Sequence, residues 1–173
     1  MIRRIGLSDL RNKPYSKPKR PLLSSPLSEP NIYGALNPRN KYRCLYCHNP
    51  DAWTLTNGIP VTLTRAIEEL RKYRHGLKIM SGGFTLSGGE TLMQDRFAVK
   101  LLGAARNMGI HTALDTNGYM GERLNDKDLE TISLVLLDIK GWDAERHRHL
   151  TGMEIAPVLS FAHRLAARNK PVW

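Results

Sequence analysis

Hydrophobic periodicity switches repeatedly between that of a helix and that of a strand from residue 61 onward, and this alternation constrains the fold most strongly. The run Leu134-Val135-Leu136-Leu137 is apolar at four successive positions. A strand-length run without alternation is typical of a strand buried on both faces, as in a parallel sheet. Because helical patterns separate the strand patterns, the sequence predicts a series of βαβ units and the fold class α/β.

The expected elements can be bounded from these patterns. Apolar residues at helical spacing predict helices over 61–77, 92–108, 125–131 and 156–168. Short apolar runs predict strands over 79–86, 110–114 and 133–139, and the beginning of another at 172–173. Gly109 and the pair Asn117-Gly118 are typical stop and turn signals. We expect the three strands to be parallel neighbours, with the helices outside them.

Residues 1–40 have a different composition. The chain has 173 residues and a net charge of +10, and this stretch holds eight Lys or Arg, two acidic residues and six of the ten prolines. Proline removes backbone donors and keeps the preceding residue out of a helix. We therefore expect a basic, proline-rich arm without regular structure, followed by a domain over 41–173. The stretch has few of the interleaved aromatic residues expected of a nucleic-acid-binding arm. It also lacks the amphipathic helix expected of an organellar transit peptide.

Composition narrows the class of protein further. Hydrophobic residues make up 41% of the chain, enough for a buried core. No apolar run reaches the roughly 18 residues of a transmembrane helix, so we expect no membrane association. Two cysteines cannot build a disulfide scaffold, and Cys44 and Cys47 are spaced like a metal or redox pair. We expect a reducing, cytoplasmic location.

Polar clusters follow three of the predicted strands, at 87–90, 115–118 and 138–140. In parallel α/β folds the chemistry gathers at the C-terminal ends of strands. Each cluster alone is explained equally well as a loop. Three clusters at successive strand ends favour one shared site.

The segment Cys44-Leu45-Tyr46-Cys47-His48 leaves several alternatives open when it is taken alone. Two thiolates at this spacing bind one metal centre or form a redox disulfide. The pattern C-x-x-C-H also matches c-type haem attachment, which normally requires an export signal that the sequence does not show. A thioredoxin-like site would follow a strand, whereas a Pro/Arg-rich segment precedes this pair. Zinc would require further ligands at paired spacing.

The motifs together go further, because residues 42–173 resemble the pyruvate formate-lyase activating enzymes, a family of the radical S-adenosylmethionine (SAM) superfamily. The matching strings are R-C-L-Y-C-H-N-P-D at 43–51, S-G-G-E at 87–90, G-I-H-T-A-L-D-T-N-G at 109–118 and L-V-L-L-D-I-K at 134–140. The longer glycyl-radical activases carry an additional cysteine cluster, which two cysteines cannot supply. The resemblance implies a partial (β/α) barrel of parallel strands, incomplete at both ends.

The resemblance also implies a cofactor site. Cys44 and Cys47 would ligate irons of a [4Fe-4S] cluster through their thiolates. Tyr46 would lie beside the adenine of SAM, and Lys140 would meet the SAM carboxylate as a point charge. His48 belongs to the same cofactor-binding segment.

The remaining implied contacts come from the strand ends. Gly88 and Gly89 would let the backbone approach the amino group of SAM, and Glu90 would pair with that ammonium. Asp115 and Asp138 would line the pocket and help hold a monovalent cation. The complete implied cofactor-binding set is Tyr46, Cys47, His48, Gly88, Gly89, Glu90, Asp115, Asp138, Ile139 and Lys140.

The family chemistry is the transfer of one electron from a reduced cluster to the SAM sulfonium. The resulting 5′-deoxyadenosyl radical removes a hydrogen atom from a glycine of the partner enzyme, here implied to be pyruvate formate-lyase. An electron donor such as flavodoxin is implied as a second partner. The cofactors supply the reactivity, and the protein supplies binding and orientation.

Two departures from the family pattern affect these expectations. The family motif C-x-x-x-C-x-x-C begins one ligand earlier, and this chain has Asn40 at that position. Asparagine is a hard, neutral ligand and replaces a thiolate on iron poorly. The N-terminal stretch and the end at Trp173 are typical of a frameshifted or truncated gene product, so we expect impaired activity. The alternative functions are an electron carrier built on Cys44, Cys47 and His48, and a non-catalytic basic binding module that uses residues 1–40.

Overall fold

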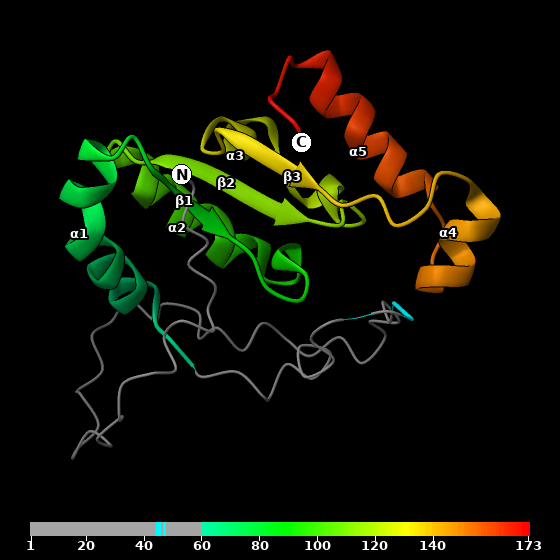
Figure 1. Cartoon of the computed structure of the whole chain (residues 1–173), viewed down its shortest axis with the longest axis horizontal. Helices are drawn as coiled ribbons and strands as arrows, with labels where there is room; N and C mark the ends of the chain where they lie inside the picture. The colour runs from blue at the N-terminus through cyan, green and yellow to red at the C-terminus, as the bar shows by residue number, and fades with distance from the viewer. Residues whose placement is uncertain (1–43, 46, 48–59) are drawn as a thin grey trace.

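The structure, a computed structural model, describes residues 44, 45, 47 and 60–173, so the expected arm over 1–40 lies outside the described residues. The described part is built on a parallel sheet of three strands, shown in Figure 1. These are β1 (Gly83–Leu86), β2 (His111–Thr116) and β3 (Leu134–Leu137). The strands are adjacent in chain order, β1-β2-β3, and both pairings are parallel, as the sequence predicts.

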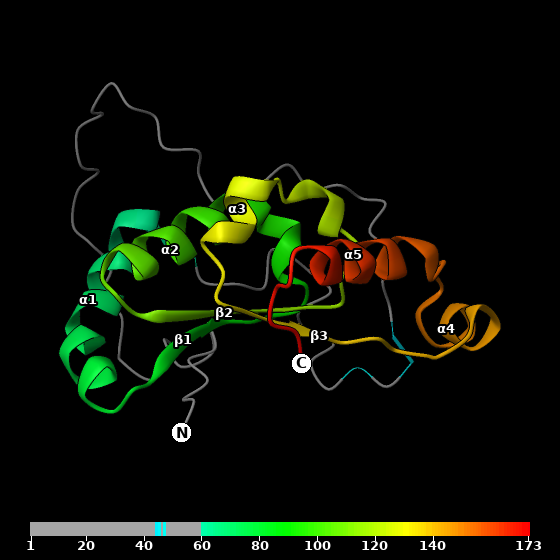
Figure 2. The same ribbon diagram turned by 90° about the horizontal axis from the view of Figure 1, so that it is seen from above.

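Helices connect the strands and cover one face of the sheet. The α-helices are α1 (Leu63–Ile79), α2 (Asp95–Asn107), α3 (Asp126–Glu130), α4 (Ala144–Thr151) and α5 (Ala156–Ala167). Two short 3-10 helices, η4 (Thr91–Gln94) and η5 (Gly121–Arg123), follow β1 and β2. Figure 2 shows α2, α3 and α5 on one side of the strands, with α1 at the left end of the sheet. Sequential parallel strands with their helices on one face form the wall of a (β/α) barrel, which confirms the expected partial barrel.

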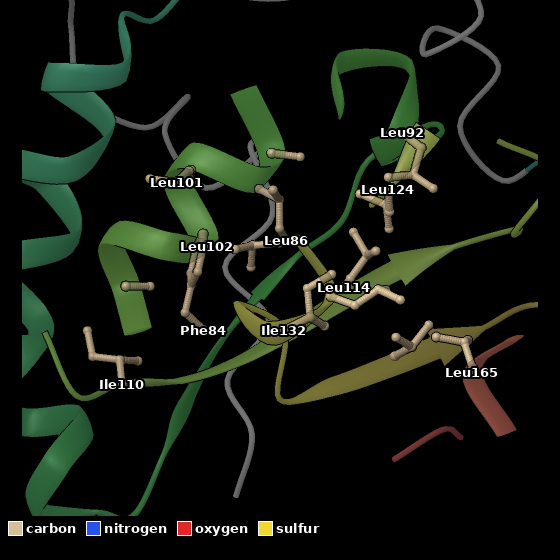
Figure 3. Close-up of a cluster of buried hydrophobic side chains, with 14 of the residues drawn as sticks. Phe84, Leu86, Leu92, Leu101, Leu102, Ile110, Leu114, Leu124, Ile132 and Leu165 are labelled. Atoms are coloured by element: carbon tan, nitrogen blue, oxygen red, sulfur yellow. The ribbon is translucent and has the colours of Figure 1, made fainter. Parts of the chain in front are cut away.

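The core lies between the sheet and this helical layer. Alternate strand residues such as Phe84, Leu114 and Val135 point toward the helices, where they meet Leu102 of α2 and Leu165 of α5. Figure 3 shows these elements contributing to one hydrophobic cluster. Because the cluster joins all three strands to the helices, it fixes how their C-terminal ends lie relative to one another.

The last residues of the chain begin a fourth parallel strand. Val172 pairs with Val135 of β3, and Leu137 N–H donates to the carbonyl of Trp173 at 2.8 Å. This pairing confirms the predicted strand beginning at 172–173.

The first predicted strand is wrong at its start. Helix α1 continues to Ile79, Ser81 has a positive φ of 48°, and β1 begins only at Gly83. Ile79 and Met80 are exposed, so their apolar character reflects neither strand nor core. The predicted helix over 92–108 likewise begins as the separate turn η4 before α2.

Helix α4 is absent from the sequence prediction. Its residues are mostly polar and show no apolar stripe, although both ends carry local signals. The carboxylate of Asp143 accepts from Arg146 N–H at 2.8 Å, and Gly152 ends the helix with a φ of 74°. Among the helices of the described residues, none combines the length and the apolar character needed to cross a membrane.

Candidate functional site

The C-terminal ends of the three strands lie at one edge of the sheet, because the strands are parallel and adjacent. The loops after β1 and β2 are joined there by side-chain hydrogen bonds. Ser87 Oγ donates to Asp115 Oδ2 at 2.8 Å, and Thr91 Oγ1 donates to the backbone carbonyl of Asp115 at 2.8 Å. The structure thus brings together two of the clusters that the sequence assigned to a shared site.

Glu90 makes the most extensive contacts between these loops. Its Oε1 accepts from Thr116 Oγ1 at 2.6 Å and from Leu92 N–H at 2.9 Å, and its Oε2 accepts from Asn117 N–H at 2.9 Å. The side chain also caps the N-terminus of η4. Both carboxylate oxygens are therefore engaged by the protein's own donors.

Burial raises the pKa of the Glu90 carboxyl above its ordinary value, while the hydrogen bonds from Thr116, Asn117 and Leu92 act in the opposite direction. The nearby Asp115 carboxylate adds to the rise. Each donor would lose a strong acceptor if Glu90 took up a proton, since a protonated carboxyl accepts less well. The geometry of this loop pair consequently depends on the charge of Glu90.

The loop after β2 has its own internal order. Gly118 N–H donates to Thr116 Oγ1 at 3.1 Å, and Tyr119 N–H donates to Asn117 Oδ1 at 2.9 Å. Gly118 has a φ of 77°, and a Cβ added there would lie 2.5 Å from Leu137 Cδ1. Glycine is required at this position for both conformational and steric reasons.

The cysteine pair lies near the end of β3. Cys47 N–H donates to the Cys44 carbonyl at 3.2 Å, which places the two residues in a turn. Leu45 N–H donates to the carbonyl of Leu150 in α4 at 3.0 Å, which attaches this turn to α4. Both cysteines are free thiols of intermediate burial.

Charged groups from the end of β3 act on the Cys44 thiol. Burial raises the pKa of Cys44, the Lys140 ammonium acts against that rise, and Cys47 and the Asp138 carboxylate add to it. Lys140 and Asp138 form an ion pair with each other. The structure therefore brings Cys44 together with the third polar cluster, at 138–140.

Asp138 also continues the sheet beyond β3, because its N–H donates to the Thr116 carbonyl at 3.0 Å. Ile139 is 43% exposed, so it does not belong to the core. Gly141 lies against α4, where an added Cβ would be 2.9 Å from His147 N. This contact explains why the chain turns from the end of β3 directly into α4.

Some of the other predicted site residues lie outside the described residues, and others lie in the loop after β1. Tyr46 and His48 lie outside the described residues. A Cβ added at Gly88 would have no atom of the described residues within 4 Å, so this part of the structure leaves the position open. Within the described residues, no group of three or more His, Cys, Asp or Glu side chains is placed to hold a metal ion.

Sequence reasoning placed Thr116 and Asn117 in the polar cluster at 115–118 but did not predict that they hold Glu90. Their partner is 26 and 27 positions away in the chain, so no local pattern reveals the contacts. The one available signal was their place directly after a buried strand. His147 was missed as well, although it is fully buried in α4.

Comparison with known proteins places this chain in a family. The model described as the radical SAM superfamily matches residues 39–173. The pyruvate formate-lyase 1-activating enzyme of Escherichia coli (strain K12) is 41% identical over 133 residues, which covers 76% of this chain and 54% of that protein.

Two further relatives give the same picture. The pyruvate formate-lyase-activating enzymes of Listeria monocytogenes (strain EGD-e) and Staphylococcus aureus (strain USA300) are 36% and 37% identical over 138 residues, each covering 76% of this chain and 55% of the relative. The chain thus spans about half the length of these curated relatives. The family match, the parallel strands and the polar strand ends agree, and the chain belongs to the radical SAM superfamily.

Proposed function

We propose that this chain binds SAM and an iron–sulfur cluster at the C-terminal edge of its sheet, with Cys44 and Cys47 as the cluster ligands. The observation that carries the proposal is the position of Cys44 beside the Lys140–Asp138 pair, at the end of the strand next to the Glu90 loops. Membership of the radical SAM superfamily implies both SAM and an iron–sulfur cluster.

The donor chemistry of this edge suits the two groups. Thiolates are soft ligands that select iron–sulfur clusters, and the turn brings two of them together. Because burial raises the pKa of Cys44, cluster binding must release a proton there, and the Lys140 ammonium reduces that cost. Lys140 is also the residue proposed to meet the SAM carboxylate.

A reduced [4Fe-4S] cluster, when bound, supplies one electron that cleaves the SAM sulfonium bond. The chain's own residues bind and orient the substrate. The open space at Gly88 leaves room for a ligand against the backbone of the loop after β1, with Gly89 beside it. Asp115 and Asp138 lie at the ends of two adjacent strands, where their carboxylates would help hold a monovalent cation.

We propose further that the physiological reaction is the formation of a glycyl radical on pyruvate formate-lyase. The relatives that carry this name support the proposal. A flavodoxin-like electron donor and a cytoplasmic location complete it. We expect a low activity, because Asn40 occupies the position of a third thiolate in the family pattern.

The test is anaerobic reconstitution of the whole chain with ferrous iron and sulfide. The expected result is the broad visible absorption of an iron–sulfur cluster, with an electron paramagnetic resonance signal that changes when SAM is added. The double variant Cys44→Ala/Cys47→Ala, which retains no cysteine, should bind no cluster. Lys72→Met, on the exposed surface of α1, is the control for Lys140→Met, which should weaken SAM binding and also lower the yield of cluster.

Covalent haem or a cluster retained in the double variant would refute the proposal. A glycyl-radical signal from pyruvate formate-lyase would establish the full activity, whereas a cluster that does not respond to SAM would exclude it.

A further inference from the structure

We propose that Glu90 is a positioning residue whose carboxylate clamps the loop after β1 to the loop after β2, and that it does not itself bind the SAM ammonium. This inference rests on the same site as the proposed function and assigns Glu90 a different role from the one the family resemblance implies. It also names Thr116 and Asn117 as the partners through which Glu90 acts.

The hydrogen-bond inventory of the carboxylate supports this role. An ionised carboxylate offers about four acceptor positions. Three donors already occupy Glu90, from Thr116 Oγ1, Leu92 N–H and Asn117 N–H, at 2.6–2.9 Å. Both oxygens are engaged, which leaves about one acceptor position, on Oε2, and a ligand ammonium there would compete with Asn117 N–H for the same oxygen.

The partners of Glu90 show what the clamp positions. Thr116 is 3% exposed, and its hydroxyl donates to Glu90 while accepting from Gly118 N–H. Asn117 donates its N–H to Glu90 and accepts from Tyr119 N–H through its side chain. The orientation of the whole segment 116–119 therefore depends on one carboxylate from the neighbouring loop.

The clamp also acts on the loop that carries it. Glu90 caps η4 through Leu92 N–H, and the side chains of Ser87 and Thr91 reach Asp115 from the same loop. Gly88 and Gly89 lie between Ser87 and Glu90, and no atom of the described residues lies within 4 Å of a Cβ added at Gly88. The anchored ends leave the backbone of the two glycines as the part of the loop that is presented to a ligand.

Two substitutions separate a clamp from a ligand contact. Glu90→Gln keeps the size of the side chain, but its NH2 group would face the Asn117 N–H donor and lose that hydrogen bond. Thr116→Val removes the hydroxyl partner and leaves the Glu90 carboxylate in place. Thr116→Ser restores the hydroxyl, and Glu122→Gln, on exposed η5, is the matched control for the change of charge.

The first measurement is hydrogen–deuterium exchange of the full chain without cofactors. Loss of one hydrogen bond should accelerate exchange at the Asn117 amide by about tenfold in Glu90→Gln. Thr116→Val should accelerate exchange at Gly118, while Thr116→Ser and Glu122→Gln should match the unaltered chain. Unchanged exchange over 116–119 in Glu90→Gln would overturn the proposal, whether or not the chain binds SAM.

The second measurement is the affinity of the reconstituted protein for SAM. A clamp predicts that Glu90→Gln and Thr116→Val weaken binding by similar factors, that the double variant is no weaker than either, and that Thr116→Ser restores the affinity. A much larger loss in Glu90→Gln than in Thr116→Val, with the two losses multiplying, would show a direct contact with the ammonium and refute the clamp. If no variant binds SAM, the proposed function fails, and the exchange measurement still decides the role of Glu90.

Discussion

Two parts of the strand-end surface are held together by different forces. The β1–β2 edge, residues 87–91 and 115–119, is joined by side-chain hydrogen bonds of 2.6–2.9 Å that link Glu90, Ser87 and Thr91 to the neighbouring loop. The cysteine edge, which comprises Cys44, Cys47, residues 138–141 and α4, depends on backbone hydrogen bonds and on the partly exposed Lys140–Asp138 ion pair.

This difference indicates that the two edges have different roles within one site. Partly buried hydrogen bonds are directional and are less sensitive to salt than exposed ion pairs, so the β1–β2 edge is shaped before any ligand binds. Interactions between exposed charges are weaker and are screened by salt. The cysteine edge is therefore the part whose properties a bound metal cluster would change most.

The largest expected effect comes from breaking the β1–β2 edge at Gly118. Valine there would force a φ of 77° on a β-branched residue and place its Cβ 2.5 Å from Leu137 Cδ1. Strain and overpacking together should lower the free energy of unfolding by about 4 kcal/mol. Chemical denaturation of Gly118→Val measures this loss.

Gly88→Ala is the matched control, because a Cβ at that glycine meets no atom within 4 Å in the part of the chain that the structure describes. Its free energy of unfolding should stay within about 0.5 kcal/mol of the unaltered chain. Equal stabilities of the two variants would contradict the steric account of Gly118.

An increase in bound iron is expected when the chain gains a third thiol at the position that the family motif gives to its first cysteine. Asn40→Cys should raise the iron bound per chain severalfold after anaerobic reconstitution, because a third soft ligand holds a cluster more securely than two. Lys72→Cys, on the exposed surface of α1, also gives a chain with three cysteines, and it should leave the iron content unchanged. Equal gains in the two variants would show that any added cysteine suffices.

How much the sequence predicts also differs between the two edges. The apolar run 134–137 and the stop and turn glycines predicted the strands that carry both edges, because these signals are local in the chain. The contacts of Glu90 with Thr116 and Asn117 join residues that only the parallel pairing of β1 and β2 brings together. Such tertiary contacts leave no periodic signal.

Helix α4, which supports the cysteine edge, was harder to predict from the sequence than the strands. Helix α4 is stabilised by the cap at Asp143 and by the close approach of Gly141, and neither produces an apolar stripe. Conversely, Ile79 and Met80 suggested a strand because of apolar side chains that the fold leaves exposed. Burial decides which apolar residues shape the fold, and a single sequence does not report burial directly.

A smaller effect should follow from the charges at the cysteine edge. In a Cys47→Ser background, Lys140→Met should raise the pKa of Cys44 further, and Asp138→Asn should lower it, since the two side chains act on the thiol with opposite signs. The rate of alkylation by iodoacetamide at mildly alkaline pH measures the thiolate fraction. It should decrease in Lys140→Met and increase in Asp138→Asn.

Salt provides the internal check on that result. Because the Lys140–Asp138 pair is partly exposed, both rate changes should shrink as the ionic strength approaches 1 M, where the screening length is about 3 Å. Rate changes that persist unaltered in high salt would point to a rearranged turn rather than to the charges.

The smallest expected effect concerns His147, the buried imidazole of α4. Neither ring nitrogen has a hydrogen-bond partner among the described residues, and burial lowers the pKa of His147 below its ordinary value of 6.5. Below pH 6.5 the imidazole therefore binds a proton in the unfolded chain but stays neutral in the folded chain. The free energy of unfolding should consequently fall as the pH drops below 6.5, by at most about 1.4 kcal/mol per pH unit. His147→Leu should remove this slope and preserve stability at neutral pH, because leucine has no buried polar atom to satisfy.

Glu90→Gln should leave the His147 slope intact and abolish a slope of opposite sign above pH 4.5, where ionisation of the buried Glu90 opposes folding. Urea denaturation across mildly acidic pH separates the two contributions, and acid sensitivity that survives in His147→Leu would assign the effect to another group.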